Sequence, residues 1–280
     1  MTYSLAYSPC PNDTYIFAAL TNGLLPDAPQ VEVVLDDVEA LNEAARHGRF
    51  ALTKVSYGAI PYLLERYRIL RSGGALGRGC GPLVVTRPRA DGSVPTLAEL
   101  GETGVFAIPG RFTTAFALLR LALGREPRTR SLRFDAIVDA VARGEVDAGL
   151  IIHESRFTYH HAGLAQAIDL GEWWEAATGN AIPLGAILVR RDVADDDAHA
   201  LDAAIRRSLQ FARQHEDAII GYVREHAFEM DEAVMRAHIG LYVNEYSDDV
   251  GPVGIAAVED LFARAAAAGF IAAGTRPEFL

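Results

Sequence analysis

The sequence predicts an α/β fold of two lobes with a ligand cleft between them, and three observations support this. Apolar runs of strand length alternate with helical patterns along most of the 280 residues, which predicts βαβ units and a mainly parallel sheet. The polar, Pro- and Gly-containing stretch 87–92 interrupts this alternation, and a second α/β set follows it. A later strand, Ala186–Val189, can return the chain to the first set. The predicted lobes are therefore a discontinuous one, 1–87 with 186–280, and an inserted one, 88–185.

The first predicted strand, Tyr3–Tyr7, ends in the segment Ser8–Thr14. Two prolines in that segment fix φ and remove backbone donors. Asn12 and Asp13 offer side-chain oxygens that can cap the following helix, Tyr15–Leu24. In α/β proteins the carboxyl end of a strand is where ligands bind, so this stiff turn indicates a small-molecule site. The other elements expected before the boundary are the strands Val31–Leu35, Leu52–Ser56, Arg68–Arg71 and Leu83–Thr86 and the helix Val38–His47.

The inserted lobe begins with a predicted strand, Gly104–Ile108, and a turn, Pro109–Arg111. The apolar helix Thr113–Leu123 follows and stops at Gly124, a residue typical of helix ends. From Ala194 onward the pattern is nearly all helical, and these C-terminal helices are expected on the first lobe. The remaining expectations for the insertion and its return are a short apolar segment Leu132–Phe134, the helix Asp135–Arg143, the strand Ala148–Ile152, the loop Asn180–Gly185 and the amphipathic helix Ile255–Ala268.

Composition limits the classes of function. The formal net charge of −11 argues against nucleic acid or an anionic membrane as the main partner. No stretch is long and apolar enough to span a bilayer, and the N-terminus lacks a signal-peptide pattern, so a cytoplasmic protein is expected. Cys10 and Cys80 are too few for a disulfide framework or a structural zinc site. We expect Cys10 to be a thiol lining the turn rather than a nucleophile, and its contact with substrate stays open.

The segment Thr53–Gly58 ends a predicted strand and should face the cleft. Lys54 offers an ammonium that can pair with a carboxylate as a point charge. Ser56 and Tyr57 add hydroxyl groups. On local grounds alone, a surface lysine near a capping serine is the preferred interpretation, because an isolated lysine and serine carry little information.

A glycine turn, an arginine and two threonines meet at the next strand-to-helix junction, Pro109–Thr114. A helix N-terminus with unpaired amides and adjacent hydroxyls is suited to an anion such as a carboxylate. Arg111, Thr113 and Thr114 are therefore candidate binding residues. The alternative is an ordinary helix cap made by one threonine.

His153 and Glu154 follow an apolar strand at its carboxyl end. Histidine titrates near neutral pH and suits proton abstraction beside a carbonyl group. The alternative is a structural histidine whose hydrogen bonds are satisfied. The sequence has no P-loop, no Gly-x-Gly-x-x-Gly opening a first helix and no clustered metal-ligand spacing, so neither nucleotide nor metal chemistry is expected.

Taken together, these segments resemble the 1,4-dihydroxy-6-naphthoate synthase family, which acts late in the futalosine route to menaquinone. The family's fold is similar to that of type II periplasmic solute-binding proteins. The resemblance implies a carbon–carbon lyase without metal or organic cofactor. Its reaction would convert cyclic dehypoxanthine futalosine, a small carboxylated molecule, to 1,4-dihydroxy-6-naphthoate and dihydroxyacetone. The motifs that support the resemblance are Ser8–Thr14, Leu52–Tyr57, Arg71–Gly79 and Gly149–Tyr159.

The resemblance also implies roles for individual residues. His153 matches the family's general base, and its substrate-contacting positions match Lys54, Val55, Ser56, Thr113 and Thr114. Ser8, Asn12 and Arg111 are added as further hydrogen-bonding candidates from their local context. Two rival functions remain: chorismate dehydratase of the same pathway, and a carboxylate-binding protein that does no chemistry, which the fold alone does not exclude. The oligomeric state is not readable from the sequence.

Overall fold

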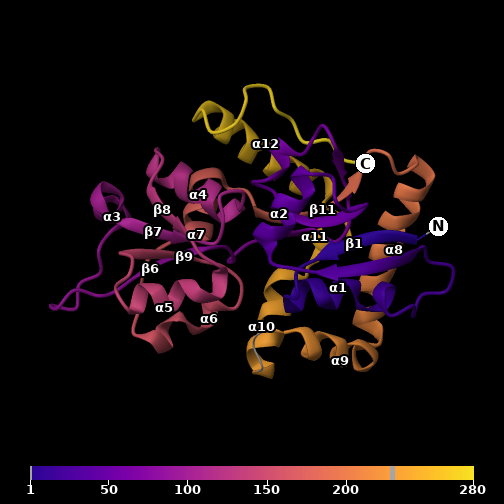
Figure 1. The fold of residues 1–280 in the computed structure, drawn as a ribbon, viewed down its shortest axis with the longest axis horizontal. Helices are drawn as coiled ribbons and strands as arrows, with labels where there is room; N and C mark the ends of the chain where they lie inside the picture. Colours follow the sequence, from indigo (N-terminus) through magenta and orange to yellow (C-terminus); the bar gives the residue numbers. More distant parts are fainter. Residues whose placement is uncertain (1, 228–230) are drawn as a thin grey trace.

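Two sheets, each covered by helices, form two lobes that lie side by side (Figure 1). The computed structural model describes residues 2–227 and 231–280. The strands are β1 Thr2–Tyr7, β2 Gln30–Leu35, β3 Leu52–Ser56, β4 Tyr67–Ile69, β5 Ala75–Gly77, β6 Leu83–Thr86, β7 Val105–Ile108, β8 Arg128–Ser131, β9 Ala148–Ile151, β10 Ala165–Asp169 and β11 Ile182–Arg190. The α-helices are α1 Pro11–Thr21, α2 Val38–Arg46, α3 Leu97–Thr103, α4 Thr114–Leu123, α5 Ile137–Ala142, α6 Ser155–Thr158, α7 Leu170–Thr178, α8 Asp195–Gln214, α9 Glu216–His226, α10 Glu232–Tyr242, α11 Glu245–Asp248 and α12 Gly251–Ala267.

The first lobe is built on a sheet with the strand order β2-β1-β3-β11-β4, in which β5 also pairs with β11. Strand β1 runs parallel to β2 and β3. Helix α1 packs against α8, α9 and α10, so almost all of its residues are buried. A helix that is apolar on all sides requires such cover on all sides, and the C-terminal helices provide it. Their predicted place on the first lobe is confirmed.

The second lobe contains the sheet β10-β6-β9-β7-β8 with helices α3 to α7. Strand β7 runs parallel to β8 and β9, whereas β6 is antiparallel to both β9 and β10. In the first lobe, β11 is antiparallel to β3, β4 and β5. The prediction of mainly parallel sheets is therefore wrong. Both sheets are mixed because β6 and β11 enter from the other lobe rather than through a βαβ crossover.

Sheet pairing also bears on where the lobes divide. Strand β6 lies in the second sheet, although it falls before the predicted boundary at 87–88. Strand β11 begins at Ile182, inside the segment predicted as a loop, and its register with β5 shifts between Pro183 and Gly185. Proline and glycine weaken a strand signal in sequence, but a bulge accommodates them. We propose that the inserted lobe begins before β6 and ends before β11.

Strand β8 shows why one edge of the second sheet was missed. The sequence predicts a short apolar segment, Leu132–Phe134, whereas the strand is Arg128–Ser131, just before it. This edge strand is mostly exposed and rich in arginine, so it has no apolar alternation to detect. Phe134 instead begins a 3₁₀ turn that leads into α5.

Helix α12 packs against both lobes, since it contacts β11 and α4. Asn180 Nδ2 donates a hydrogen bond to Asp260 Oδ2 on this helix over 3.0 Å. Within the described ranges 2–227 and 231–280, no helix combines the length and apolarity needed to cross a membrane.

Candidate functional site

A cavity of about 100 Å³ lies between the lobes, and residues of both lobes line it. The first lobe contributes the carboxyl ends of β1 and β3 and part of α10, and the second contributes the end of β9 and the start of α4. Strand ends that converge in this way are where α/β proteins bind ligands. The predicted site residues that line the cavity are Ser8, Asn12, Val55, Ser56, Thr113, Thr114 and His153.

The turn after β1 forms the floor of the site. Cys10 is the N-cap of α1 and Pro11 is its first residue, a position where proline costs no helical hydrogen bond. The predicted capping by Asn12 and Asp13 is wrong, because both residues lie inside the first turn. Their side chains are therefore available for contacts across the site.

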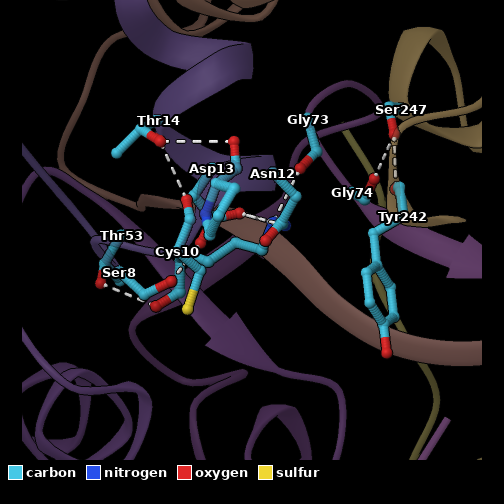
Figure 2. Close-up of polar contacts among 12 residues, drawn as sticks. Ser8, Cys10, Asn12, Asp13, Thr14, Thr53, Gly73, Gly74, Tyr242 and Ser247 are labelled. Atoms are coloured by element: carbon cyan, nitrogen blue, oxygen red, sulfur yellow. Dashed lines mark hydrogen bonds and ion pairs between the residues drawn. The ribbon is translucent and has the colours of Figure 1, made fainter. Parts of the chain in front are cut away.

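Asp13 connects the buried polar groups of this turn (Figure 2). Its Oδ2 accepts a hydrogen bond from Ser8 Oγ over 2.7 Å. Its Oδ1 accepts from Asn12 Nδ2 over 2.8 Å and from Lys54 Nζ over 2.7 Å. Burial of a carboxylate is tolerated when it is paired and hydrogen-bonded in this way. The network fixes the orientation of Ser8 and Asn12, both of which face the cavity.

Lys54 lies beneath the cavity rather than in its wall. Its ammonium donates to Asp13 and to the carbonyl oxygen of Gly73, the latter over 3.1 Å. The side chain is only 6% exposed, and it is absent from the cavity lining. The carboxylate that pairs with Lys54 is therefore that of Asp13, and not that of a substrate as the sequence suggested.

Ser56 lines the cavity at the end of β3 and is held by α2. Its backbone N–H donates to Asn42 Oδ1 over 2.9 Å, and its hydroxyl oxygen accepts from Asn42 Nδ2 over 3.3 Å. A hydroxyl that accepts in this way still has its own proton to donate. Ser56 therefore offers a positioned donor to a ligand.

Thr113 and Thr114 place the start of α4 against the cavity. Thr113 is the N-cap, and its Oγ1 accepts from the N–H of Phe116 over 3.2 Å. Thr114 Oγ1 donates to the carbonyl of Leu184 over 2.8 Å and accepts from the N–H of Gly58 over 3.0 Å. Both threonines hold the helix end in place, and the backbone N–H groups of its first turn have no preceding helical acceptor.

Arg111 does not reach the cavity. Its guanidinium donates to Glu126 Oε1 over 3.0 Å, and its side chain is 61% exposed. Within the junction Pro109–Thr114, the two threonines line the cavity and Arg111 points away from it. The sequence has no signal for this difference in direction.

His153 follows β9 with φ of +57°, one of two non-glycine residues with positive φ in the described ranges. Such a conformation is strained and is often kept at functional sites. The ring packs edge-on against Phe134, with 4.9 Å between centroids. Its Nδ1 lies 3.4 Å from Cys10 Sγ of the other lobe. The predicted base therefore sits where the two lobes meet.

Two residues of α10 complete the wall, and the sequence analysis missed both. His238 Nε2 lies 2.9 Å from Asn12 Oδ1, and the rings of His238 and Tyr242 are 4.6 Å apart. Since Asn12 Nδ2 donates to Asp13, its Oδ1 must accept, which places the proton of His238 on Nε2. Helix α10 lies far along the chain from the turn, so no local motif points to these residues.

Burial, together with the smaller effect of the nearby His153 ring, lowers the pKa of His238 to about 3. In the unfolded chain the same group titrates near about 6.5. Its contribution to stability is therefore complete above the unfolded pKa and is lost as the pH falls from about 6.5 toward the folded pKa.

We expect His238→Gln to make folding less sensitive to acid. Between about pH 7.5 and about pH 4.5, the native protein should lose about 2–3 kcal/mol more unfolding free energy than the variant. Urea unfolding at the two pH values measures the difference. His215→Gln, at an exposed position, is the control. Equal losses in the native protein and in the His238 variant would contradict the prediction.

Cys10 is buried, with 1% of its surface exposed. Burial raises the pKa of this thiol well above its usual value, and the carboxylates of Glu154 and Asp13 raise it further. A protonated thiol is a poor nucleophile. The structure thus favours the interpretation of Cys10 as a thiol in the turn.

The lobes meet closely at two glycines. A Cβ on Gly110 would lie 2.1 Å from Glu39 Cδ, and a Cβ on Gly58 would lie 2.8 Å from the carbonyl oxygen of Thr113. Glu39 Oε1 accepts a hydrogen bond from the N–H of Phe112 over 3.1 Å. Helix α2 of the first lobe is therefore joined to the loop after β7 of the second lobe.

The arrangement of two lobes around one cavity is that of periplasmic solute-binding proteins. The alkanesulfonate-binding protein SsuA of Xanthomonas axonopodis pv. citri has a TM-score of 0.69 at 15% identity, covering 96% of this chain and 94% of that chain. A solved protein of Archaeoglobus fulgidus has a TM-score of 0.89 at 34% identity, covering 96% and 98%. The predicted fold class is confirmed.

The sequence relatives narrow this class to a family. The model of a menaquinone biosynthesis family matches residues 3–267. The 1,4-dihydroxy-6-naphthoate synthase of Thermus thermophilus is 51% identical, covering 99% of this chain and 98% of its own. The synthase of the same name from Streptomyces coelicolor is 46% identical, covering 97% and 95%. The chain belongs to this menaquinone biosynthesis family and is an enzyme, which confirms the resemblance noted in its motifs.

Proposed function

We propose that this enzyme is a 1,4-dihydroxy-6-naphthoate synthase that acts as a carbon–carbon lyase. It converts cyclic dehypoxanthine futalosine to 1,4-dihydroxy-6-naphthoate and releases dihydroxyacetone. The observation that supports this most is the position of His153 in the cavity between the lobes, in a chain similar over nearly its whole length to two synthases of that name. Two buried free cysteines fit a reducing compartment, and we place the enzyme in the cytoplasm.

In the proposed mechanism, neutral His153 removes a proton from the substrate. Electron flow then breaks the carbon–carbon bond to the sugar remnant, and formation of the aromatic ring makes the step favourable. The imidazolium returns the proton to the departing three-carbon fragment, so no proton is consumed overall. General-base assistance of this kind contributes about 100- to 10,000-fold, and a closed cleft that positions the substrate contributes the rest.

The start of α4 is the proposed binding place for the substrate carboxylate. Thr113, Thr114 and Ala115 line the cavity there, and the first-turn N–H groups and the helix dipole favour an anion. Ser8, Asn12 and Ser56 supply further hydrogen bonds from the first lobe. Lys54 contributes through Asp13, by holding the turn that presents Ser8 and Asn12.

The test is a chromatographic assay of the purified protein with cyclic dehypoxanthine futalosine. We expect naphthoate and dihydroxyacetone to appear in equal amounts. Calorimetric binding of the substrate without product would instead indicate a carboxylate-binding protein. Dehydration of chorismate in a parallel assay would indicate the sister enzyme of the pathway.

Closure of the lobes can be tested at Gly110. We expect Gly110→Ala to lower kcat/KM by about 10- to 100-fold, because the new methyl group displaces Glu39 and with it the contact between the lobes. The measurement is steady-state kinetics in the same assay. Gly221→Ala is the matched control, since a Cβ there meets nothing within 4 Å. An unchanged kcat/KM in the Gly110 variant would contradict a role for this contact.

A further inference from the structure

Three potential metal ligands converge where the lobes meet. Cys10 Sγ, a ring nitrogen of His153 and a carboxylate oxygen of Glu154 all lie within 4.8 Å of one another. Cys10 belongs to the first lobe, and the other two residues follow β9 in the second. Cys10 is 143 positions from His153 in the chain, so the metal-ligand spacing that the sequence lacks is created by folding.

The carboxylate of Glu154 is the unusual member of this cluster. The residue is 7% exposed, and among the residues that the structure describes neither of its oxygens has a hydrogen-bond partner. The buried carboxylate of Asp13 differs, because it accepts three hydrogen bonds, one of them from Lys54. A buried carboxylate without a donor is costly, and a bound cation would remove that cost.

The distance between Cys10 and His153 and the three donor types match zinc. His153 Nδ1 and Cys10 Sγ are 3.4 Å apart, and sulfur and nitrogen ligands of a tetrahedral zinc ion are separated by about 3.5 Å. One thiolate, one imidazole and one carboxylate favour Zn²⁺ or Co²⁺ over Mg²⁺ or Ca²⁺, which prefer oxygen ligands only. His153 also faces the cavity, which leaves a fourth position for water.

We propose that Cys10, His153 and Glu154 form a binding site for a thiophilic divalent cation, best matched by Zn²⁺, and that the bound cation inhibits the enzyme by occupying His153. Cys10 binds as the thiolate and releases its proton to solvent. The thiolate and the carboxylate then balance the two positive charges. Because the ligands come from both lobes, the cation also holds the cleft closed.

The test uses the whole reduced protein, freed of metal by a chelator, and titrates it with Co²⁺. We expect one ion per chain and a thiolate-to-cobalt charge-transfer absorption that Zn²⁺ displaces. Cys10→Ser should abolish the absorption, whereas Cys80→Ala, at the other buried thiol, should retain it. Glu154→Gln keeps the side-chain shape but removes the charge of a proposed ligand. It should therefore weaken Zn²⁺ binding by more than the about 10- to 100-fold typical of a change in a residue that only hydrogen-bonds a ligand.

Two results would overturn the proposal. One is a native protein that binds no Co²⁺ or Zn²⁺ up to millimolar concentration. The other is an absorption that persists in Cys10→Ser, which would place the ion elsewhere. Circular dichroism of each variant shows whether it is folded, and Glu154→Gln provides an independent test if the cysteine variant does not fold.

The inhibition rests on the proposed function and is measured separately. We expect Zn²⁺ to suppress naphthoate formation by the native protein, and a chelator to restore it. Zinc binding through Cys10 in a protein that forms no naphthoate would refute the proposed function but keep the site. Naphthoate formation that is insensitive to saturating Zn²⁺ would overturn the inhibitory role.

Discussion

His153→Ala is expected to abolish naphthoate formation while substrate binding stays largely intact. The ring supplies the proposed proton transfer, and loss of a general base lowers kcat by about 100- to 10,000-fold. The binding groups are held by other partners than the ring: Ser56 bonds to Asn42, and Thr113 at the start of α4 accepts from the N–H of Phe116. The kinetic assay measures kcat, and calorimetry measures the Kd of the substrate.

The matched control is His161→Ala, which removes an exposed histidine of the same lobe. Imidazole added to the His153 variant should restore part of kcat, because the truncated side chain leaves room for it in the cavity. Retention of kcat by the variant would show that the base lies elsewhere. Loss of binding together with kcat would assign His153 a positioning role.

Lys54→Met is expected to lower the free energy of unfolding by about 3–5 kcal/mol. The substitution keeps the apolar part of the side chain but leaves the Asp13 carboxylate buried without its cation. Ser8 and Asn12 would still donate to that carboxylate, but neutral donors do not balance its charge. Urea denaturation at neutral pH measures the loss.

Two further variants test whether the loss of stability comes from the buried charge pair. Asp13→Asn combined with Lys54→Met removes both charges and should recover much of the stability that the single change loses. Arg224→Ala breaks an exposed pair with Glu232, both side chains being 48% exposed, and should cost less than about 1 kcal/mol. A loss of similar size for Lys54→Met and Arg224→Ala would refute a structural role for the buried pair.

Local pattern was enough to identify many of the elements that form the site. The predicted strand Leu52–Ser56 agrees with β3 at both ends, and the helix predicted from Thr113 differs from α4 only in that Thr113 is its cap. These elements are short runs whose periodicity and end residues are set by neighbours in the chain. Strand β8 and the start of β11 were not predicted, because arginine in β8 and proline and glycine in β11 interrupt the apolar pattern of a strand.

The sequence predicted which residues reach the cavity where a residue ends a strand or begins a helix, whereas their roles stay predictions. Ser56, Thr113 and His153 line the cavity as expected, since strand ends converge in an α/β lobe. Lys54 and Arg111 lie elsewhere, because the direction of a side chain depends on which partner it finds. Asp13 and Glu126 are those partners, and spacing in the chain does not reveal them.

The amino-acid order alone was therefore sufficient for the α/β class, most element positions, the strand-end residues and the family. Folding settled the mixed direction of the sheets, the burial of Lys54 against Asp13 and the approach of His238 to Asn12, 226 positions away. It also brought Cys10 to His153 and, within the part of the chain that the structure describes, left Glu154 without a donor. The reason is that local periodicity depends on near neighbours, whereas charge pairing and burial depend on segments that meet only after the two lobes have packed together.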